Sequence, residues 1–272
     1  MSTSLPLPPP ATGGAKLLSR AGVAWFVVAA AGQTAFIVFI VLFYGVRTLS
    51  GRFAAWNDKP LITGYVEGDG VGNWIFAAHV LLATVVTLGG LMQLVPALRR
   101  RFPALHRWTG RSFLTIACFL ALSGLWMSVA RGAYLSVVSA VAIGINGLLI
   151  LIFAGLAWRE AIRRRFDSHR RWAMRTFMVV SGVWFLRVGL MGWVLINRGP
   201  VGMTKTLSGP ADIVLTFGSY LIPLAVLELY FAAGRSASSA FRIGVAGLVL
   251  VAAAWTALGS VGAAALMWFP YL

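Results

Sequence analysis

The feature that most constrains this chain is a basic motif that occurs twice, each time between two long apolar segments. The two copies are Arg99-Arg100-Arg101-Phe102 with Arg107, Trp108 and Arg111, and Arg163-Arg164-Arg165-Phe166 with Arg171, Trp172 and Arg175. Matching residues of the two copies are 64 positions apart throughout. The repeated unit is therefore a helix, a basic hinge and a second helix. Two such units in one orientation predict a parallel internal repeat in a membrane protein, at about 74–130 and 136–196.

The composition also indicates a membrane protein, because 59% of the residues are apolar and only 11% are charged. A helix needs about 20 apolar residues to cross a bilayer. Seven segments reach that length, at about 22–46, 74–98, 112–130, 136–157, 173–196, 213–233 and 243–268. We therefore predict an all-α polytopic bundle of seven transmembrane helices. Spans two to five are expected to form a pseudo-symmetric four-helix core.

The chain divides into a short tail and one membrane domain. Met1–Ala15 is rich in Pro, Ser and Gly, and we expect residues 1–21 to form a mobile cytoplasmic tail. The first apolar segment is longer than the roughly 7–15-residue core of a cleavable signal, so we interpret it as a retained anchor. Residues 22–272 are expected to form a single seven-span domain.

The distribution of basic residues predicts the orientation. Sixteen Lys and Arg residues fall in the tail and in the loops on its side of the membrane, six fall on the other side, and Arg187 lies within a span. Basic loops stay in the cytoplasm, so we expect a bacterial inner-membrane protein with a cytoplasmic N-terminus and a periplasmic C-terminus. This placement explains the net charge of +16 without nucleic acid as a partner, and the expected partner is the lipid bilayer.

The scarcity of acidic and metal-binding side chains excludes several kinds of chemistry. Of seven acidic residues only Glu228 lies within a span, so paired carboxylates for acid–base catalysis are missing from the membrane interior. The chain has three His and one Cys, Cys118, which argues against a metal site and rules out a disulfide within the chain. Hydrolysis and metal-dependent group transfer are therefore disfavoured, and the sequence assigns no catalytic residue.

A few polar side chains lie inside the predicted spans, where lipid does not tolerate them without a partner or a role. His79 and Arg187 fall roughly 8 and 13 Å from the outer face at 1.5 Å per residue, and Asn146 falls near mid-membrane. We expect these three residues to line a ligand pocket that opens outward. In the alternative, Arg187 is a structural tether that donates to helix carbonyls or reaches Glu228. Gln33 and Gln93 complete the polar set.

The basic hinges have two interpretations. Arginines at the inner surface fix the topology and attract anionic lipid headgroups, at about 1 kcal/mol each. The i,i+4 arginine pairs would also present two guanidinium groups on one helix face, suited to a phosphate or carboxylate. The expected headgroup-binding residues are Arg107, Trp108, Arg111, Arg171, Trp172 and Arg175. In addition, His106 and His169 lie at the same expected depth, where two facing imidazoles could ligate one haem iron.

These motifs together resemble a bacterial family of predicted membrane proteins catalogued as domain of unknown function 2306. The resemblance covers about residues 70–195 and implies a family without an assigned activity. The segments that carry it are His79, Gly89-Gly90-Leu91-Met92-Gln93, Arg99–Phe102, His106-Arg107-Trp108-Thr109-Gly110-Arg111, His169-Arg170-Arg171-Trp172-Ala173-Met174-Arg175 and Leu186-Arg187.

A weaker resemblance is to cytochrome b561-type proteins, in which four consecutive helices carry four His that hold two haems. His79, His106 and His169 match the first, second and fourth of those positions. The third position has no His, since only Arg131, Tyr134 and Ser136 lie near it. The resemblance therefore implies at most one b-type haem, held by His106 and His169 on the cytoplasmic side. It also implies that a quinone or another small molecule binds near His79.

Three functional hypotheses stay open at this point. The first is a redox protein that binds one b-type haem and a quinone. The second is a non-catalytic binder or carrier of an anionic lipid or amphiphile. The third is an accessory subunit of a larger membrane complex, docking through small-residue surfaces at Gly244–Gly247 and Gly259–Gly262.

Overall fold

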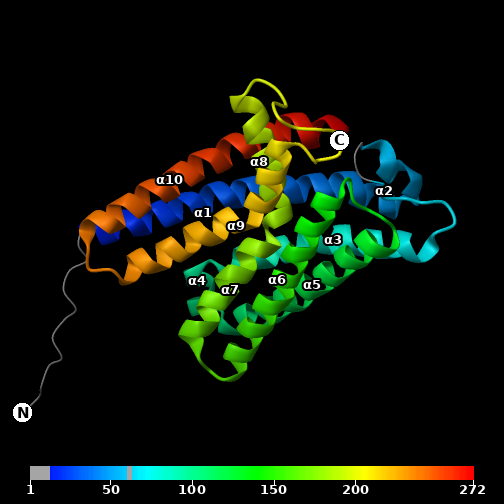
Figure 1. Ribbon diagram of the computed structural model, residues 1–272. Helices are drawn as coiled ribbons and strands as arrows, with labels where there is room; N and C mark the ends of the chain where they lie inside the picture. The colour runs from blue at the N-terminus through cyan, green and yellow to red at the C-terminus, as the bar shows by residue number, and fades with distance from the viewer. Residues whose placement is uncertain (1–12, 60–62) are drawn as a thin grey trace, which may run out of the picture.

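The computed structural model describes residues 13–59 and 63–272, and within these residues it contains helices and no strand. The elements in chain order are α1 (Gly13–Phe39), η1 (Ile40–Gly45), α2 (Val46–Leu49), η2 (Phe53–Asp58), α3 (Gly70–Gln93), α4 (Pro96–Arg101), α5 (Pro103–Ala130), α6 (Val137–Ile162), α7 (Phe166–Val180), α8 (Gly182–Ile196), α9 (Pro210–Arg235), α10 (Ser239–Gly262), η3 (Ala263–Trp268) and η4 (Phe269–Tyr271). Figure 1 shows their arrangement. The prediction of an all-α membrane protein is confirmed.

Six helices in the described part of the chain are long and apolar enough to cross a bilayer. They are α3, α5, α6 and α9, the continuous helix from α1 through α2, and the one from α10 through η4. The pair α7 and α8 passes the same test as a unit, but the two helices are bent by 51°. The structure therefore has six candidate spans, or seven if the bent pair crosses the membrane once.

Two predicted boundaries were wrong. Helix α1 begins at Gly13, so residues 13–21, which we expected in the mobile tail, are helical. Leu18 and Ala21 of this segment are buried against α9 and α10 residues such as Val249, and that packing extends the helix. Residues 1–12 of the predicted tail lie outside the described residues. The span expected as one helix at 173–196 is broken at Ser181.

The break between α7 and α8 has a local cause in the sequence. Ser181 and Gly182 follow each other, and such a pair is a recognised site of helix kinks. The Gln33 side chain of α1 donates from Nε2 to Ser181 Oγ at 3.1 Å. Asn146 of α6 lies so close to Gly182 that an added Cβ would meet its Nδ2 at 3.0 Å. Polar groups from two other helices therefore hold the chain at the break.

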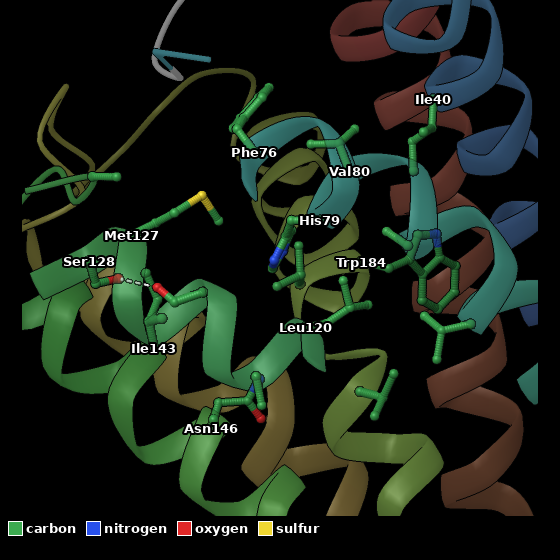
Figure 2. A pocket seen from close by; sticks show the side chains of 18 of the residues that line it. Ile40, Phe76, His79, Val80, Leu120, Met127, Ser128, Ile143, Asn146 and Trp184 are labelled. Carbon is green, nitrogen blue, oxygen red and sulfur yellow. Dashed lines mark hydrogen bonds between the residues drawn. The ribbon is translucent and has the colours of Figure 1, made fainter. Parts of the chain in front are cut away.

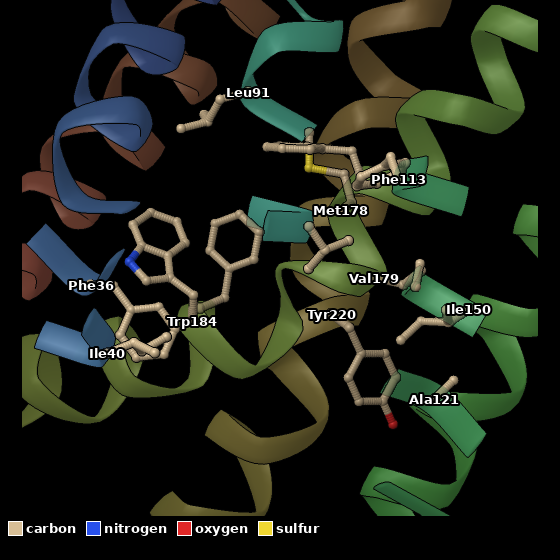
Figure 3. Close-up of a cluster of buried hydrophobic side chains, with 14 of the residues drawn as sticks. Phe36, Ile40, Leu91, Phe113, Ala121, Ile150, Met178, Val179, Trp184 and Tyr220 are labelled. Carbon is tan, nitrogen blue, oxygen red and sulfur yellow. The ribbon is translucent and has the colours of Figure 1, made fainter. Parts of the chain in front are cut away.

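The bent pair connects two groups of helices. Helices α3, α5, α6 and α7 pack in sequence against one another, while α8 packs against α9 and α10, and α10 lies along α1. In Figure 1, α1 and α10 run side by side across the top of the bundle formed by α3, α5, α6 and α7. Buried apolar residues from both groups form one continuous core, which includes Phe36, Phe113, Val179 and Trp184 (Figure 3).

The contact between α8 and α10 depends on small residues. An added Cβ on Gly259 would collide with the Val188 carbonyl of α8, and Gly262 faces Met191 and Leu195 in the same way. The prediction that Gly259–Gly262 forms a lipid-facing docking surface was therefore wrong, because these glycines let two helices of one chain approach each other closely. Gly244 and Gly247 are exposed.

The two basic hinges adopt different structures. In the first copy, Leu94 and Val95 separate α3 from the short helix α4, and the single residue Phe102 separates α4 from α5. In the second copy α6 ends at Ile162, and a turn with Arg164 at φ 56° leads directly into α7. Arg107 and Arg111 nevertheless lie within α5, and the equivalent Arg171 and Arg175 lie within α7.

Candidate functional site

A cavity of about 560 Å³ lies between the two groups of helices, within the size range of small-molecule sites. Its walls come from α1, α3, α5, α6, α7 and α8. Along α5 its lining runs from Phe113 to Ser128, which corresponds to roughly 22 Å at 1.5 Å per residue. This length of lining is comparable to most of the roughly 30 Å thickness of a hydrocarbon core.

The three residues predicted to form a ligand pocket all line this one cavity. His79 projects from α3, Asn146 from α6 and Arg187 from α8. Figure 2 shows His79 and Asn146 with Trp184 and the apolar side chains around them. Their shared location follows from the antiparallel pairing of α3 with α5 and from the bend before α8. Whether a ligand binds there stays a prediction.

His79 is oriented by a contact to the neighbouring helix. Its Nδ1 lies 2.7 Å from Ser123 Oγ on α5, and that hydroxyl donates to the Leu120 carbonyl at 3.2 Å. The hydroxyl has a single hydrogen, so while it donates to Leu120 the tautomer with hydrogen on Nδ1 donates to Ser123 and leaves the other ring nitrogen as an acceptor. The ring is thereby fixed in the cavity wall.

Arg187 carries a positive charge at the cavity without a carboxylate partner among the described residues. Its Nη1 donates to the Val183 carbonyl at 2.9 Å, and its guanidinium lies 5.4 Å from the centre of the Phe36 ring. The alternative that Arg187 reaches Glu228 was wrong, because Glu228 accepts two bonds from Arg175, at 2.6 and 2.9 Å. The donation to a helix carbonyl, which was the other part of that alternative, is present.

Lys59 is a cavity residue that sequence reasoning missed. It is only 8% exposed, and its Nζ lies 4.9 Å from the centre of the Tyr271 ring. Desolvation by burial, and then the positive charge of Arg187, lower the pKa of Lys59 from 10.5 to about 8. A lysine in a polar loop before Pro60 gives no sign of burial in the sequence, because the burial comes from distant aromatic residues.

Arg131, at the same end of the cavity, has a structural role. It forms an ion pair with Asp69 at 2.9 Å and donates to the Gly72 carbonyl at 3.1 Å and to Asn73 Oδ1 at 3.1 Å. These bonds join the end of α5 to the start of α3. Among the described residues that line the cavity none is acidic, so Lys59 and Arg187 are its two cations without a carboxylate partner.

A polar layer crosses the middle of the cavity at the break between α7 and α8. Gln33 is 1% exposed, and its Oε1 has no hydrogen-bond partner, although Nε2 of the same amide is bonded to Ser181. Asn146 Oδ1 is also buried and unpartnered. Buried polar atoms are nearly always satisfied, so these two acceptors favour a donor group or water in the cavity.

Two aromatic rings line the end of the cavity nearest the basic hinges. Phe113 of α5 and Phe177 of α7 are 5% and 3% exposed and both line the cavity. A Cβ added to Gly90 of α3 would lie 3.0 Å from an atom of each ring. The glycine therefore allows both rings to lie against the α3 backbone.

The predicted haem ligands lie away from this cavity. His169 Nδ1 is 2.8 Å from the Ala157 carbonyl, whereas His106 Nδ1 is buried without a partner. Gln93, another polar residue of the spans, donates to the His106 carbonyl at 3.2 Å and to Thr109 at 2.6 Å. The two imidazoles act on each other electrostatically. No group of three or more His, Cys, Asp or Glu in the described residues could hold a metal ion.

The six predicted headgroup-binding residues are more exposed in the first copy of the motif than in the second. Arg107 and Trp108 are exposed, and the Arg111 guanidinium lies 5.2 Å from the Trp108 ring centre. In the second copy Arg171 is exposed and Trp172 is half-buried. The equivalent guanidinium, that of Arg175, lies over Trp172 at 4.5 Å and is already bonded to Glu228. Headgroup binding by these residues stays a prediction.

The comparison with known families matches residues 76–231, which is more than half of the chain, to a family described as predicted membrane protein. No curated protein and no solved structure is significantly similar to the chain. The matched region includes most of α3, both basic hinges, the bent pair α7–α8 and most of α9. The chain therefore belongs to the family of predicted membrane proteins catalogued as domain of unknown function 2306.

Proposed function

We propose that this protein binds an anionic amphiphile in the cavity between its two groups of helices. The observation that carries the proposal is the pairing of two unneutralised cations, Lys59 and Arg187, with a long apolar wall and no acidic lining residue among those described. An acidic headgroup would lie between the two cations. Its apolar chain would lie along the side chains of α3 and α5, toward Phe113.

The electrostatics of the cavity favour an anion strongly. A buried cation without a partner costs free energy, because it has lost water and gained no opposite charge. Lys59 and Arg187 repel each other, which further destabilises the unliganded state. A carboxylate or phosphate placed between them would offset both penalties, and Arg187 can bind such a group through two parallel N–H donors.

The orientation of the protein is part of the same proposal. Seven spans, with a pseudo-symmetric core of spans two to five, would place Lys59 and Arg187 toward the periplasm of a bacterial inner membrane. The excess of basic residues in the opposite loops supports this orientation. The cavity would then receive its ligand from the outer leaflet or from the periplasm.

The orientation can be tested with reporter fusions. An alkaline phosphatase fused after Leu272 is expected to be exported and active, because an odd number of spans separates the two termini. A fluorescent protein fused after Arg165, in the second basic hinge, is expected to fold in the cytoplasm. An inactive phosphatase at the C-terminus would show that α7 and α8 do not cross the membrane as one span.

Removal of either cation should weaken binding of an anionic amphiphile. A charge-assisted hydrogen bond contributes roughly 1.5–3 kcal/mol, so Arg187→Leu and Lys59→Met should each raise the Kd at least about tenfold. Arg187→Lys keeps the positive charge but loses the planar guanidinium with its two parallel N–H donors. We therefore expect its Kd to lie between those of the wild type and Arg187→Leu. Tryptophan fluorescence titration of the purified protein with dodecyl phosphate measures these constants.

The matched control for Lys59→Met is Lys205→Met, because Lys205 is exposed in the loop before α9 and does not line the cavity. Dodecyl phosphocholine, which has the same chain and no net charge, controls for apolar binding. Equal affinities for the two detergents would contradict the proposed role of the cations. So would equal effects of the two lysine substitutions.

Binding should also depend on pH through Lys59. The pKa of Lys59 is lowered to about 8, so the ammonium is present below that pH and is lost as the pH rises through it. Affinity for a ligand that keeps its charge should therefore fall between pH 7 and 9. In Lys59→Arg the charge persists, and the fall should disappear. A persistent fall in that variant would assign the titration to another group.

The inner histidines support a second candidate function. His169 Nδ1 is held by a backbone carbonyl, which is how proteins orient a metal-binding imidazole and leave its other nitrogen free. The nearby His106 has an unpartnered ring nitrogen. We infer that these two residues would hold a b-type haem, which would supply one-electron transfer at the inner side.

The haem hypothesis is tested by absorption spectra of protein purified from haem-replete cells. A sharp band after dithionite reduction, lost in both His106→Ala and His169→Ala, is expected if the hypothesis is correct. His79→Ala is the control and should keep the band, because His79 is bonded to Ser123 in the cavity, which neither His106 nor His169 lines. A colourless wild-type protein would end this hypothesis and leave the amphiphile proposal unaffected.

A further inference from the structure

The floor of the cavity is formed by two residues that are equivalent in the internal repeat. Phe113 and Phe177 are 64 positions apart, which is the offset of the two basic motifs. Both rings meet at Gly90, where an added Cβ would lie 3.0 Å from each of them. Each unit of the repeat therefore supplies one ring to the contact at Gly90. The proposed binding of an anionic amphiphile does not require such a contact.

Beyond this floor the chain presents the two basic hinges. Arg111 lies two residues before Phe113, and Arg175 lies two residues before Phe177. Two residues on a helix correspond to about 200°, so each arginine projects from the opposite side of its helix to the phenylalanine. Along the axes of α5 and α7 the two rings therefore lie between the cavity and the hinge arginines, of which Arg107 and Arg171 are exposed.

The helix that carries Phe177 ends at the break in the bent pair. Phe177 lies in the last turn of α7, and the next helix begins after the break at Ser181 with a bend of 51°. A change in that angle would move the ring away from Gly90, whereas α8 is held by its close contact to α10. Breaks of this kind in membrane helices accompany binding sites and moving parts.

We propose that Phe113 and Phe177 form the inner gate of a path across the membrane, along which the protein moves an anionic amphiphile between the two leaflets. The proposal rests on the proposed function, since the transported molecule is the one that binds at Lys59 and Arg187. When the rings part, the acidic headgroup leaves the outer cations and passes the polar layer at Gln33. It then reaches the arginines of the hinges.

The test uses purified protein in liposomes of phosphatidylcholine with lysophosphatidic acid that carries an NBD fluorophore on its chain. The probe is added outside, and dithionite then bleaches the fluorophore that remains in the outer leaflet. Protection that grows with time measures transfer to the inner leaflet. Binding of the same probe is measured separately in detergent, from the increase in NBD fluorescence on transfer to an apolar site.

A reversible cross-link tests the gate directly. Phe113→Cys and Phe177→Cys, introduced together with Cys118→Ser, should be bridged by a short bis-methanethiosulfonate reagent, because the side chains at both positions point to Gly90 from different helices. The cross-linked protein should bind the probe within twofold of the untreated protein but transfer it at least tenfold more slowly. Reduction of the linker's disulfides should restore transfer. A pair that does not cross-link, or a cross-linked protein that transfers at the full rate, would overturn the gate.

A second experiment uses substitutions that are expected to leave the fold intact. Phe113→Leu with Phe177→Leu keeps apolar side chains of similar volume at both positions, so the bundle should fold and transfer should be faster than in the wild type. The matched control is Phe119→Leu, since Phe119 lies on the same helix, is 38% exposed and does not line the cavity. Equal rates for the double variant and the control would also overturn the gate.

The outcomes separate this inference from the function on which it rests. Wild-type protein that binds the probe but never protects it from dithionite overturns the inference and leaves the binding function intact. Protein that does not bind the probe overturns both. Equal transfer of a zwitterionic lysophosphatidylcholine carrying the same fluorophore would show that the path lacks selection for anions and would contradict the role given to the cations.

Discussion

The arrangement of this bundle depends on the break between α7 and α8. A straight helix through Ser181 could not pack against α6 at one end and against α10 at the other, because those helices belong to different groups. The bend of 51° lets one chain segment serve both groups and leaves the space between them unfilled. Gln33 holds the break through Ser181, and the amide oxygens of Gln33 and Asn146 have no hydrogen-bond partner among the described residues.

The ion pairs of the protein also set the two unpaired cations of the cavity apart from its other charged side chains. The described part of the chain pairs its scarce carboxylates with particular arginines: Asp69 with Arg131 joins the start of α3 to the end of α5, and Glu228 with Arg175 joins α9 to α7. Lys59 and Arg187 are left without such partners although both face one cavity. A bundle that needed these cations only for stability would place a carboxylate beside them, since an unpaired cation in a low-dielectric site is costly.

Much of the architecture was predictable because the bilayer imposes simple physical rules. Length and apolarity identified the helices, and the cost of polar groups in lipid singled out His79, Asn146 and Arg187, which all line the cavity. The break at Ser181 was missed, because a serine and a glycine in an apolar run do not reveal which distant amide will bind them. Lys59 was missed for a similar reason, since its burial depends on Tyr271, more than 200 positions away in the chain.

The contact of Phe113 and Phe177 with Gly90 also limits where residues can be inserted or deleted during evolution. One residue inserted into a helix turns everything beyond it by about 100°. An insertion in α3 between His79 and Gly90 would therefore break either the contact of His79 with Ser123 or the contact of the two rings with Gly90. An insertion in the loop between α8 and α9 would not rotate these helical residues relative to one another. Homologous chains should thus differ in the lengths of their loops while the intervals between these helical residues stay constant.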